Sequence, residues 1–72
     1  MEIYRLSNRG YELAHNYRSP GTPEWLVIHY LNRYGGIATR EQIFEHVPSA
    51  SSSTLAKLSR RGIIIGGKGV NV

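Results

Sequence analysis

Serine hydroxyls and cations gather in one stretch, residues 48–62, and these side chains are the best suited in the chain to hold a ligand. Helical spacing puts Ser51, Leu55 and Leu58 on one face, so the other serines and the cations point toward solvent or a partner. Small hydroxyl side chains followed by cations can lie against a phosphate backbone without steric conflict. This face is therefore a candidate for binding nucleic acid.

The histidines and serines do not form a pattern typical of a metal site or of catalysis. His15, His29 and His46 fall on three different predicted helices, and no two share a face at ligand spacing. No serine stands in a Gly-x-Ser-x-Gly elbow, and the chain has no cysteine to act as a nucleophile or to form a disulfide. We expect no metal, no cofactor and no enzymatic activity.

A glycine-rich run, residues 66–69, separates the β-branched segments 63–65 and 70–72. It is similar to phosphate-binding loops and to the GxxG loop of the KH RNA-binding domain, but both of those loops lead into a helix. Only three residues follow the run here. We expect a β-hairpin with a glycine tip, where Lys68 lies near a phosphate or is solvated.

The composition indicates one small basic domain. The 72 residues include 9 Lys and Arg against 5 acidic residues, all glutamate, which gives a net charge of +4. A basic balance favours a polyanion as partner, nucleic acid first, although a merely solvated basic surface fits the charge equally well. The apolar runs are too short to cross a bilayer and there is no export leader, so we expect a cytoplasmic protein without membrane contact.

The first elements expected along the chain are a strand and a helix. Residues 2–6 alternate as a short β-strand does. Ser7 can cap a helix over residues 8–17, although Gly10 weakens its first turn.

A second helix is expected over residues 23–34. Thr22 before Pro23 marks its start, because threonine caps a helix and proline suits the first helical position. Trp25 and Tyr30 lie off the centre of its apolar stripe, where aromatic side chains more often complete the edge of a core than bind a ligand.

Two short helices should follow in close succession. Thr39 and Gln42 form a capping box for a helix over residues 40–46, and Ile37 just before it adds an apolar contact. Pro48 and Ser49 then mark the start of the serine-rich helix. Its end is predicted at Arg60, Arg61 and Gly62, because cations suit the negative end of the helix dipole and glycine accepts a left-handed cap.

The order of helix, short helix, helix, glycine and β-hairpin resembles a winged helix-turn-helix domain. The likeness is closest at residues 55–64, where two leucines are followed by polar residues, Gly62 and an aliphatic strand, and it covers about residues 22–72. The resemblance implies an α+β fold, mostly α, with a three-helix core and a C-terminal β-hairpin wing. A short N-terminal strand and helix in residues 1–21 precede it.

Residues 4–14 depart from the usual order. In many archaeal and bacterial regulators of this family, a similar segment follows the wing as its last strand and a C-terminal helix. Here it comes first. The N-terminal segment therefore pairs with the wing and packs on the core of its own chain, or does so on a partner, or the sequence is a piece of a tandem protein.

The resemblance implies a small transcriptional regulator that binds double-stranded DNA, with the serine-rich helix in the major groove and the wing beside the backbone. The groove-facing positions hold no arginine, asparagine or glutamine, the residues that make bidentate base contacts. With roughly three to five phosphates neutralised, log K should fall at a slope of about −3 to −4 in log salt. The implied DNA-binding residues are Arg40, Ser49, Ser52, Ser53, Lys57, Arg60, Arg61 and Lys68.

The alternative is a winged helix that serves as a protein–protein interaction module without binding DNA, since a fold does not fix a function. A homodimer through the N-terminal segment or through the side that carries Trp25 and Tyr30 is compatible with either reading. The location of the charge discriminates between them: one contiguous basic face favours DNA, and an exposed apolar patch around Trp25, Tyr30 and Tyr34 favours a protein partner.

Overall fold

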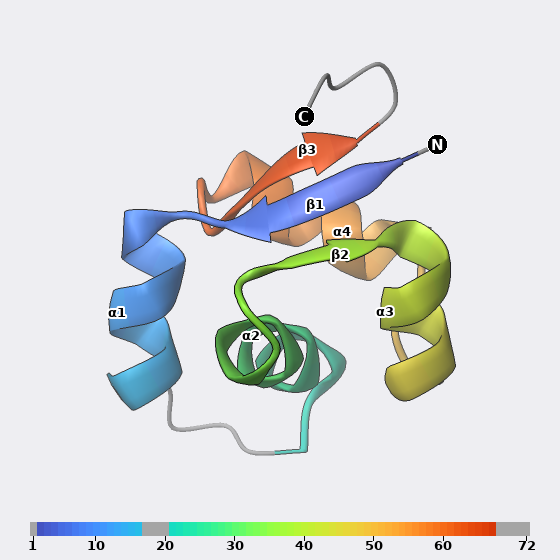
Figure 1. Ribbon diagram of the computed structural model, residues 1–72, viewed down its shortest axis with the longest axis horizontal. Coiled ribbons are helices and arrows are strands. Elements are labelled where there is room, and N and C mark those ends of the chain that lie inside the picture. Colours follow the sequence, from blue (N-terminus) through green and yellow to red (C-terminus); the bar gives the residue numbers. More distant parts are fainter. Residues whose placement is uncertain (1, 17–20, 68–72) are drawn as a thin grey trace.

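The computed structural model describes residues 2–16 and 21–67. These residues form a small α+β domain with four helices and a three-stranded antiparallel sheet, which confirms the expected class (Figure 1). The elements along the chain are β1 (Ile3–Leu6), α1 (Asn8–Asn16), α2 (Pro23–Arg33), β2 (Ile37–Thr39), α3 (Arg40–His46), α4 (Ser52–Arg60) and β3 (Ile64–Gly67).

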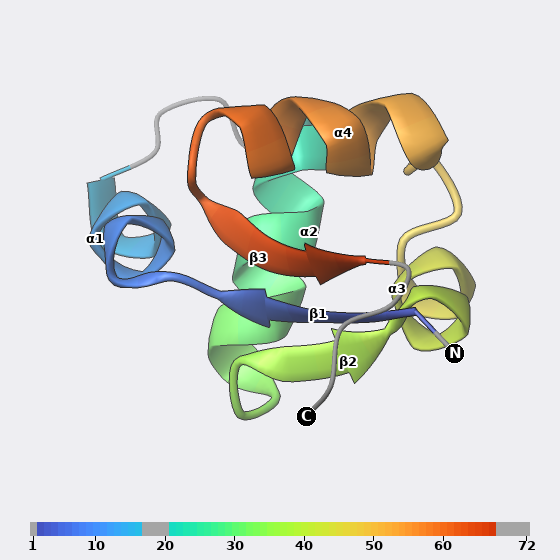
Figure 2. The same ribbon diagram turned by 90° about the horizontal axis from the view of Figure 1, so that it is seen from above.

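The N-terminal strand β1 lies at the centre of the sheet, in the strand order β2-β1-β3 (Figure 2). Ile3 is opposite Thr39 on one side and opposite Gly67 on the other, and both pairings are antiparallel. The N-terminal strand therefore pairs within its own chain. It joins two segments that are far apart in the sequence.

The alternation of β1 determines which side of the sheet is covered. Tyr4 and Leu6 are buried and Arg5 is exposed, because successive side chains of a strand point to opposite faces. All four helices lie on the side of Tyr4 and Leu6, with α2 behind the sheet and α1 and α3 at opposite ends (Figures 1 and 2). The core between these layers consists of Tyr4, Leu6, Val27, Ile28, Leu31, Ala38, Ile43, Val47, Leu55, Leu58, Ile63 and Ile64.

The caps predicted for α2 and α3 are confirmed. The backbone N–H of Trp25 donates to the Thr22 hydroxyl, and α2 ends at Arg33, one residue before the predicted end. In α3, the Thr39 and Gln42 side chains each bond to the other residue's backbone N–H, as a capping box requires. The N-terminal ends of both helices could be predicted because each cap depends on residues only three positions apart.

The serine-rich helix begins later than predicted. Ser51, not Ser49, is its N-cap, and Ser51 and Thr54 form a capping box in which each side chain accepts from the other's backbone N–H. Ser49 lies in the turn between the helices and is exposed. The prediction that Ser51 shares the buried face was also wrong, because Thr54 takes that place at 5% exposure beside Leu55 and Leu58.

Strand β2 was not predicted. Ile37 was expected to add an apolar contact, but it is 44% exposed, and its neighbour Ala38 is the buried residue. The error has a physical reason: a three-residue segment becomes a strand only because β1 pairs with it. No local pattern indicates such a partner.

Glycine backbones make the end of α4 and the pairing of β3 possible. Gly62 follows the helix with φ of +71°, which confirms the predicted left-handed stop. Gly66 has φ of +141°, and a Cβ there would collide with the backbone of Ile3 on the neighbouring strand. The predicted strand 63–65 overlaps β3, but Gly66 and Gly67, which were expected at the hairpin tip, lie within β3 opposite Tyr4 and Ile3. Tyr17, Lys68 and the predicted strand 70–72 lie outside the described residues.

Within the described part of the chain, every helix is too short or too polar to span a bilayer.

Candidate nucleic-acid interface

The outward side of α4 is polar and carries no carboxylate. Thr54, Leu55 and Leu58 fix the helix against the core. The side chains on the opposite side are all exposed: Ser52, Ser53, Ala56, Lys57, Ser59 and Arg60. The cations follow the serines along the helix, so its first turn is neutral and its last turn is basic. That order suits the helix dipole, whose negative end attracts cations.

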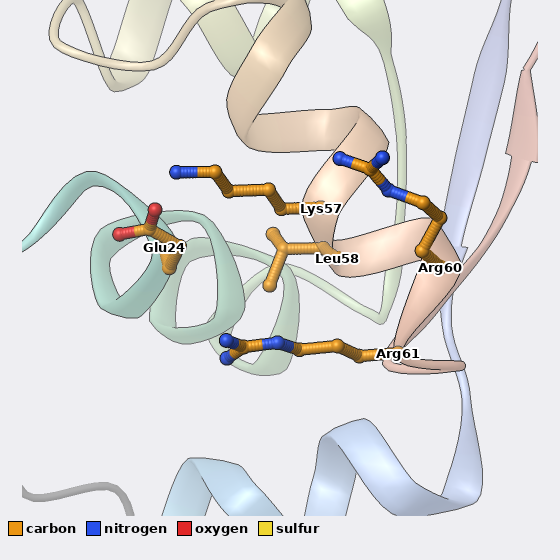
Figure 3. A pocket seen from close by; sticks show the side chains of 5 residues that line it. All are labelled: Glu24, Lys57, Leu58, Arg60 and Arg61. Carbon is orange, nitrogen blue, oxygen red and sulfur yellow. The ribbon is translucent and has the colours of Figure 1, made fainter.

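Three cations border a hollow of about 470 Å³ where α4 meets the start of α2. We call it the α4 hollow, and its lining consists of Glu24, Lys57, Leu58, Arg60 and Arg61. Figure 3 shows the Lys57 and Arg61 side chains extending toward α2 on either side of Leu58, with Glu24 on α2 near the Lys57 ammonium.

The α4 hollow carries more positive than negative charge. Three cations face one carboxylate, and among the described residues no ion pair within 4.0 Å joins Glu24 to any of them. Lys57, Arg60 and Arg61 are all exposed, so their charged groups are accessible from solvent. An oxyanion entering this hollow would meet cations from two successive turns of chain, the geometry in which arginine and lysine bind phosphate.

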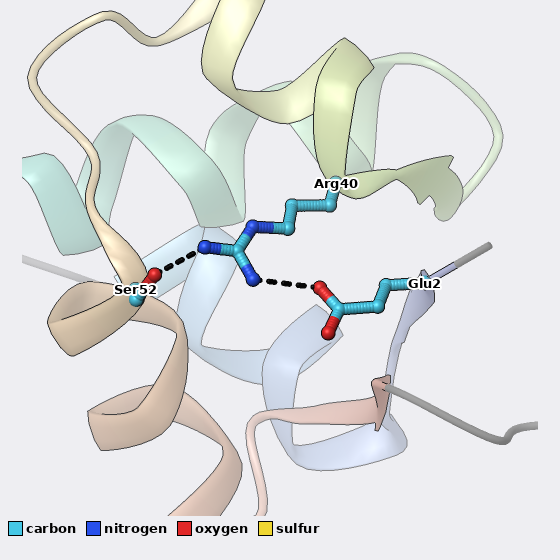
Figure 4. Close-up of polar contacts among 3 residues, drawn as sticks. All are labelled: Glu2, Arg40 and Ser52. Atoms are coloured by element: carbon cyan, nitrogen blue, oxygen red, sulfur yellow. Dashed lines mark hydrogen bonds and ion pairs between the residues drawn. The ribbon is translucent and has the colours of Figure 1, made fainter.

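Arg40 lies at the other end of α4 and is held by contacts within the chain (Figure 4). Its guanidinium donates to the Glu2 carboxylate at 2.8 Å and to the Ser52 hydroxyl, and it lies 5.0 Å from the centre of the Phe44 ring. The hydrogen bond to Glu2 raises the pKa of Arg40, whose guanidinium is charged at neutral pH with or without this contact. Arg40 thereby joins the N-terminal segment to the first turn of α4.

The structure thus divides the predicted DNA-binding residues into two groups. Lys57, Arg60 and Arg61 gather around the α4 hollow. Arg40 and Ser52 contact each other at the start of the helix, and Arg40 shares its charge with Glu2. Of the remaining predicted residues, Ser49 and Ser53 are exposed and belong to neither group. Lys68 lies outside the described residues.

Two carboxylates at the interface were missed from the sequence. Glu2 was assigned only to a strand, yet Glu2 and Arg40 form the sole ion pair among the residues the structure describes. Glu24 was assigned only to the first turn of α2, and it also lines the α4 hollow. No local signal predicts either role, because each depends on how distant segments pack.

The aromatic side of α2 forms a separate surface. Trp25 is half-buried and stacks on His29 with ring centres 4.7 Å apart. Tyr30 is also half-buried, whereas Tyr34 is 58% exposed. The described residues contain no group of three histidine or carboxylate side chains placed to hold a metal ion.

Comparisons of this chain with protein-family models, with curated proteins and with solved structures gave no match.

Proposed function

We propose that this domain binds double-stranded DNA as a small transcriptional regulator, with the outward side of α4 in the major groove. The observation that carries the proposal is the α4 hollow, where Lys57, Arg60 and Arg61 converge beside a helix face without a carboxylate. Small serine side chains allow the helix backbone to approach the bases, and the cations lie where a phosphate backbone would run.

We infer that the fold is a winged helix-turn-helix with an altered chain order. The tight connection between α3 and α4 supports this, because Ala50 N–H donates to the Val47 carbonyl within it. The pairing of β1 with β3 supports it as well. In this interpretation β1 takes the place of the last wing strand and α1 that of the helix that follows the wing in related regulators.

The side chains on α4 support affinity more than sequence discrimination. Ser53, Ala56 and Arg60 lie opposite the buried stripe, and a serine hydroxyl distinguishes bases weakly. Most of the affinity would then come from phosphate contacts and would fall steeply with salt. Arg40 contributes differently in this account, by holding the first turn of α4 in place through Ser52.

The proposal is tested by removing two charges from the α4 hollow. The variant Arg60→Gln with Arg61→Gln should bind a labelled random-sequence duplex more weakly at low salt in fluorescence anisotropy. Its slope of log K against log salt should become shallower by about 1.8, since each phosphate contact contributes about 0.9. The matched control is Arg9→Gln with Arg33→Gln, which removes the same charge from two exposed positions outside α4.

The control separates a binding site from a general effect of net charge. The proposal predicts that the control variant keeps a slope close to that of the parent protein. Equal losses in both variants would mean that the α4 hollow has no special role. No binding by the parent at low salt would favour the alternative, a protein–protein interaction module.

A further inference from the structure

Aromatic rings from α2 and α3 form a second hollow, of about 250 Å³, between these two helices. We call it the aromatic hollow. Tyr30 and His46 stack with ring centres 4.7 Å apart, and Tyr34 lies 5.1 Å from Tyr30 and 6.1 Å from His46. Arg33 also lines the hollow, beside the buried Val47. The three rings hold one another in place across the two helices.

Part of this surface extends beyond the core. Leu26 and Tyr30 pack against the core and Val47 belongs to it, yet Tyr34 stays 58% exposed at the end of α2. A large aromatic side chain held rigid in the open loses little entropy on binding, and such side chains are enriched among the anchors of protein interfaces. The aromatic hollow is thus preformed to accept an apolar side chain.

The charge around the aromatic hollow favours an acidic partner. Within the described parts of the chain, its lining contains Arg33 and the imidazoles of His29 and His46, and no carboxylate. The His46 Nδ1 lies 3.0 Å from the Gln42 carbonyl oxygen, which can only accept, so Nδ1 carries a proton and the ring is held against its own helix. A carboxylate beside the hollow would meet the Arg33 guanidinium.

Two other occupants fit less well. In a symmetric dimer the same patch of each copy faces the other. Arg33 would then lie near Arg33 of the second copy, and the described lining offers no carboxylate to balance the two charges. Single-stranded nucleic acid stacks on open ring faces beside a row of cations. Here the Tyr30 ring is already stacked on His46, and Arg33 is the one arginine in the lining among the residues that the structure describes.

We propose that the aromatic hollow binds an acidic peptide segment of a protein partner, with one apolar side chain packed against the Tyr34 ring and a carboxylate at Arg33. The α4 hollow involves Glu24 at the start of α2, whereas Arg33 is at its end, about 14 Å away along the helix axis. The domain can therefore hold this partner while α4 is occupied. The inference does not depend on DNA binding.

The test uses a panel of short amidated peptides in which one apolar residue is flanked by aspartate and glutamate, and a matched panel flanked by lysine. Each peptide is titrated into the ¹⁵N-labelled domain, and amide shifts are followed. We expect saturable shifts at Arg33, Tyr34 and His46 with acidic peptides and none with lysine peptides. Arg33→Glu should weaken the best acidic peptide about tenfold or more, and Tyr34→Ala about fivefold or more. The control Arg9→Glu, the same charge change on α1, should leave binding unchanged.

Tyr34 is exposed, so the thermal midpoint of Tyr34→Ala should stay close to that of the parent and loss of binding will not reflect unfolding. Several results would overturn the proposal. These are no saturable shift with any acidic peptide, equal shifts with both panels, or stronger shifts of the same amides with single-stranded DNA. Sedimentation that shows a dimer abolished by Tyr34→Ala would assign the surface to a second copy instead.

Discussion

Leu58 is the side chain on which the position of α4 most directly depends. It is 1% exposed and points from α4 toward α2, beneath the α4 hollow (Figure 3). Its burial followed from the sequence, because Leu55 and Leu58 are spaced as on one helix face. The position of the Glu24 carboxylate could not be predicted from the sequence, because Glu24 reaches the α4 hollow only through the packing of α2 on α4.

Leu58→Ala should lower the free energy of unfolding by about 2–5 kcal/mol, because it removes buried methyl groups and leaves a cavity. Total stabilities of small domains are about 5–15 kcal/mol, so the variant is expected to be marginally folded. Urea denaturation followed by circular dichroism measures the change, with the exposed Ser59→Ala as control. A midpoint equal to that of the parent would show that α4 does not pack through Leu58.

Tyr4 links stability to alkaline pH. Its burial raises the pKa of its hydroxyl above the usual 10.0, the charge of Glu2 raises it further, and Arg40 lowers it. Because the folded state holds the proton more tightly, this contribution to stability is fully present below about pH 10 and is lost as the pH rises beyond it.

Tyr4→Phe should therefore reduce the loss of stability above pH 10, measured as the urea midpoint at a series of alkaline pH values. Tyr34→Phe is the control, because Tyr34 is mostly exposed. If the urea midpoint of Tyr4→Phe fell above pH 10 as steeply as that of the parent, Tyr4 would not be the source of this loss of stability.

Among the secondary-structure elements, α4 begins later than the sequence predicted, and mutation of its N-cap tests this. Ser51 caps the helix through Thr54, whereas Ser49 lies in the preceding turn. Ser51→Ala should lower the free energy of unfolding by about 1 kcal/mol, within the usual range for a lost N-cap, and Ser49→Ala should change it little. Thermal denaturation of the two variants side by side measures the difference. The reverse order of effects would restore Ser49 as the cap.

Helix α1 is fixed against the turn that follows α4. The Ser7 hydroxyl shares its one proton between the carbonyl oxygens of Gly62 and Ile63 and accepts from the Gly10 N–H. A Cβ on Gly10 would lie 2.5 Å from the Ile63 carbonyl oxygen. The glycine predicted to weaken this helix therefore allows it to pack.

Gly10→Ala should destabilise the domain by about 1–3 kcal/mol, because overpacking outweighs the better helix propensity of alanine. Chemical denaturation measures the effect, and Glu12→Ala on the exposed side of the same helix is the control. A more stable Gly10→Ala variant would mean that α1 stands away from the turn.

At the scale of the whole molecule, local features were predictable and long-range pairing was not. Thr39 with Gln42 indicates a helix start because the partners lie within one turn. The central place of β1, the strand at Ile37–Thr39 and the contact of Glu2 with Arg40 all join segments far apart in the chain. Their sequence patterns fit several partners, and only packing of the whole domain selects one. For the same reason, the polar side of α4 was predicted and the hollow beside it was not.

The central claim is that α4 and the α4 hollow bind duplex DNA. The most direct measurement is an NMR titration of the ¹⁵N-labelled domain with a random-sequence duplex at low salt, repeated at higher salt. The account predicts shifts clustered on residues 52–61 and at Glu24 that fade as salt rises, with Tyr34 and His46 unaffected. An absence of shifts at low salt, or shifts confined to the aromatic hollow, would contradict it.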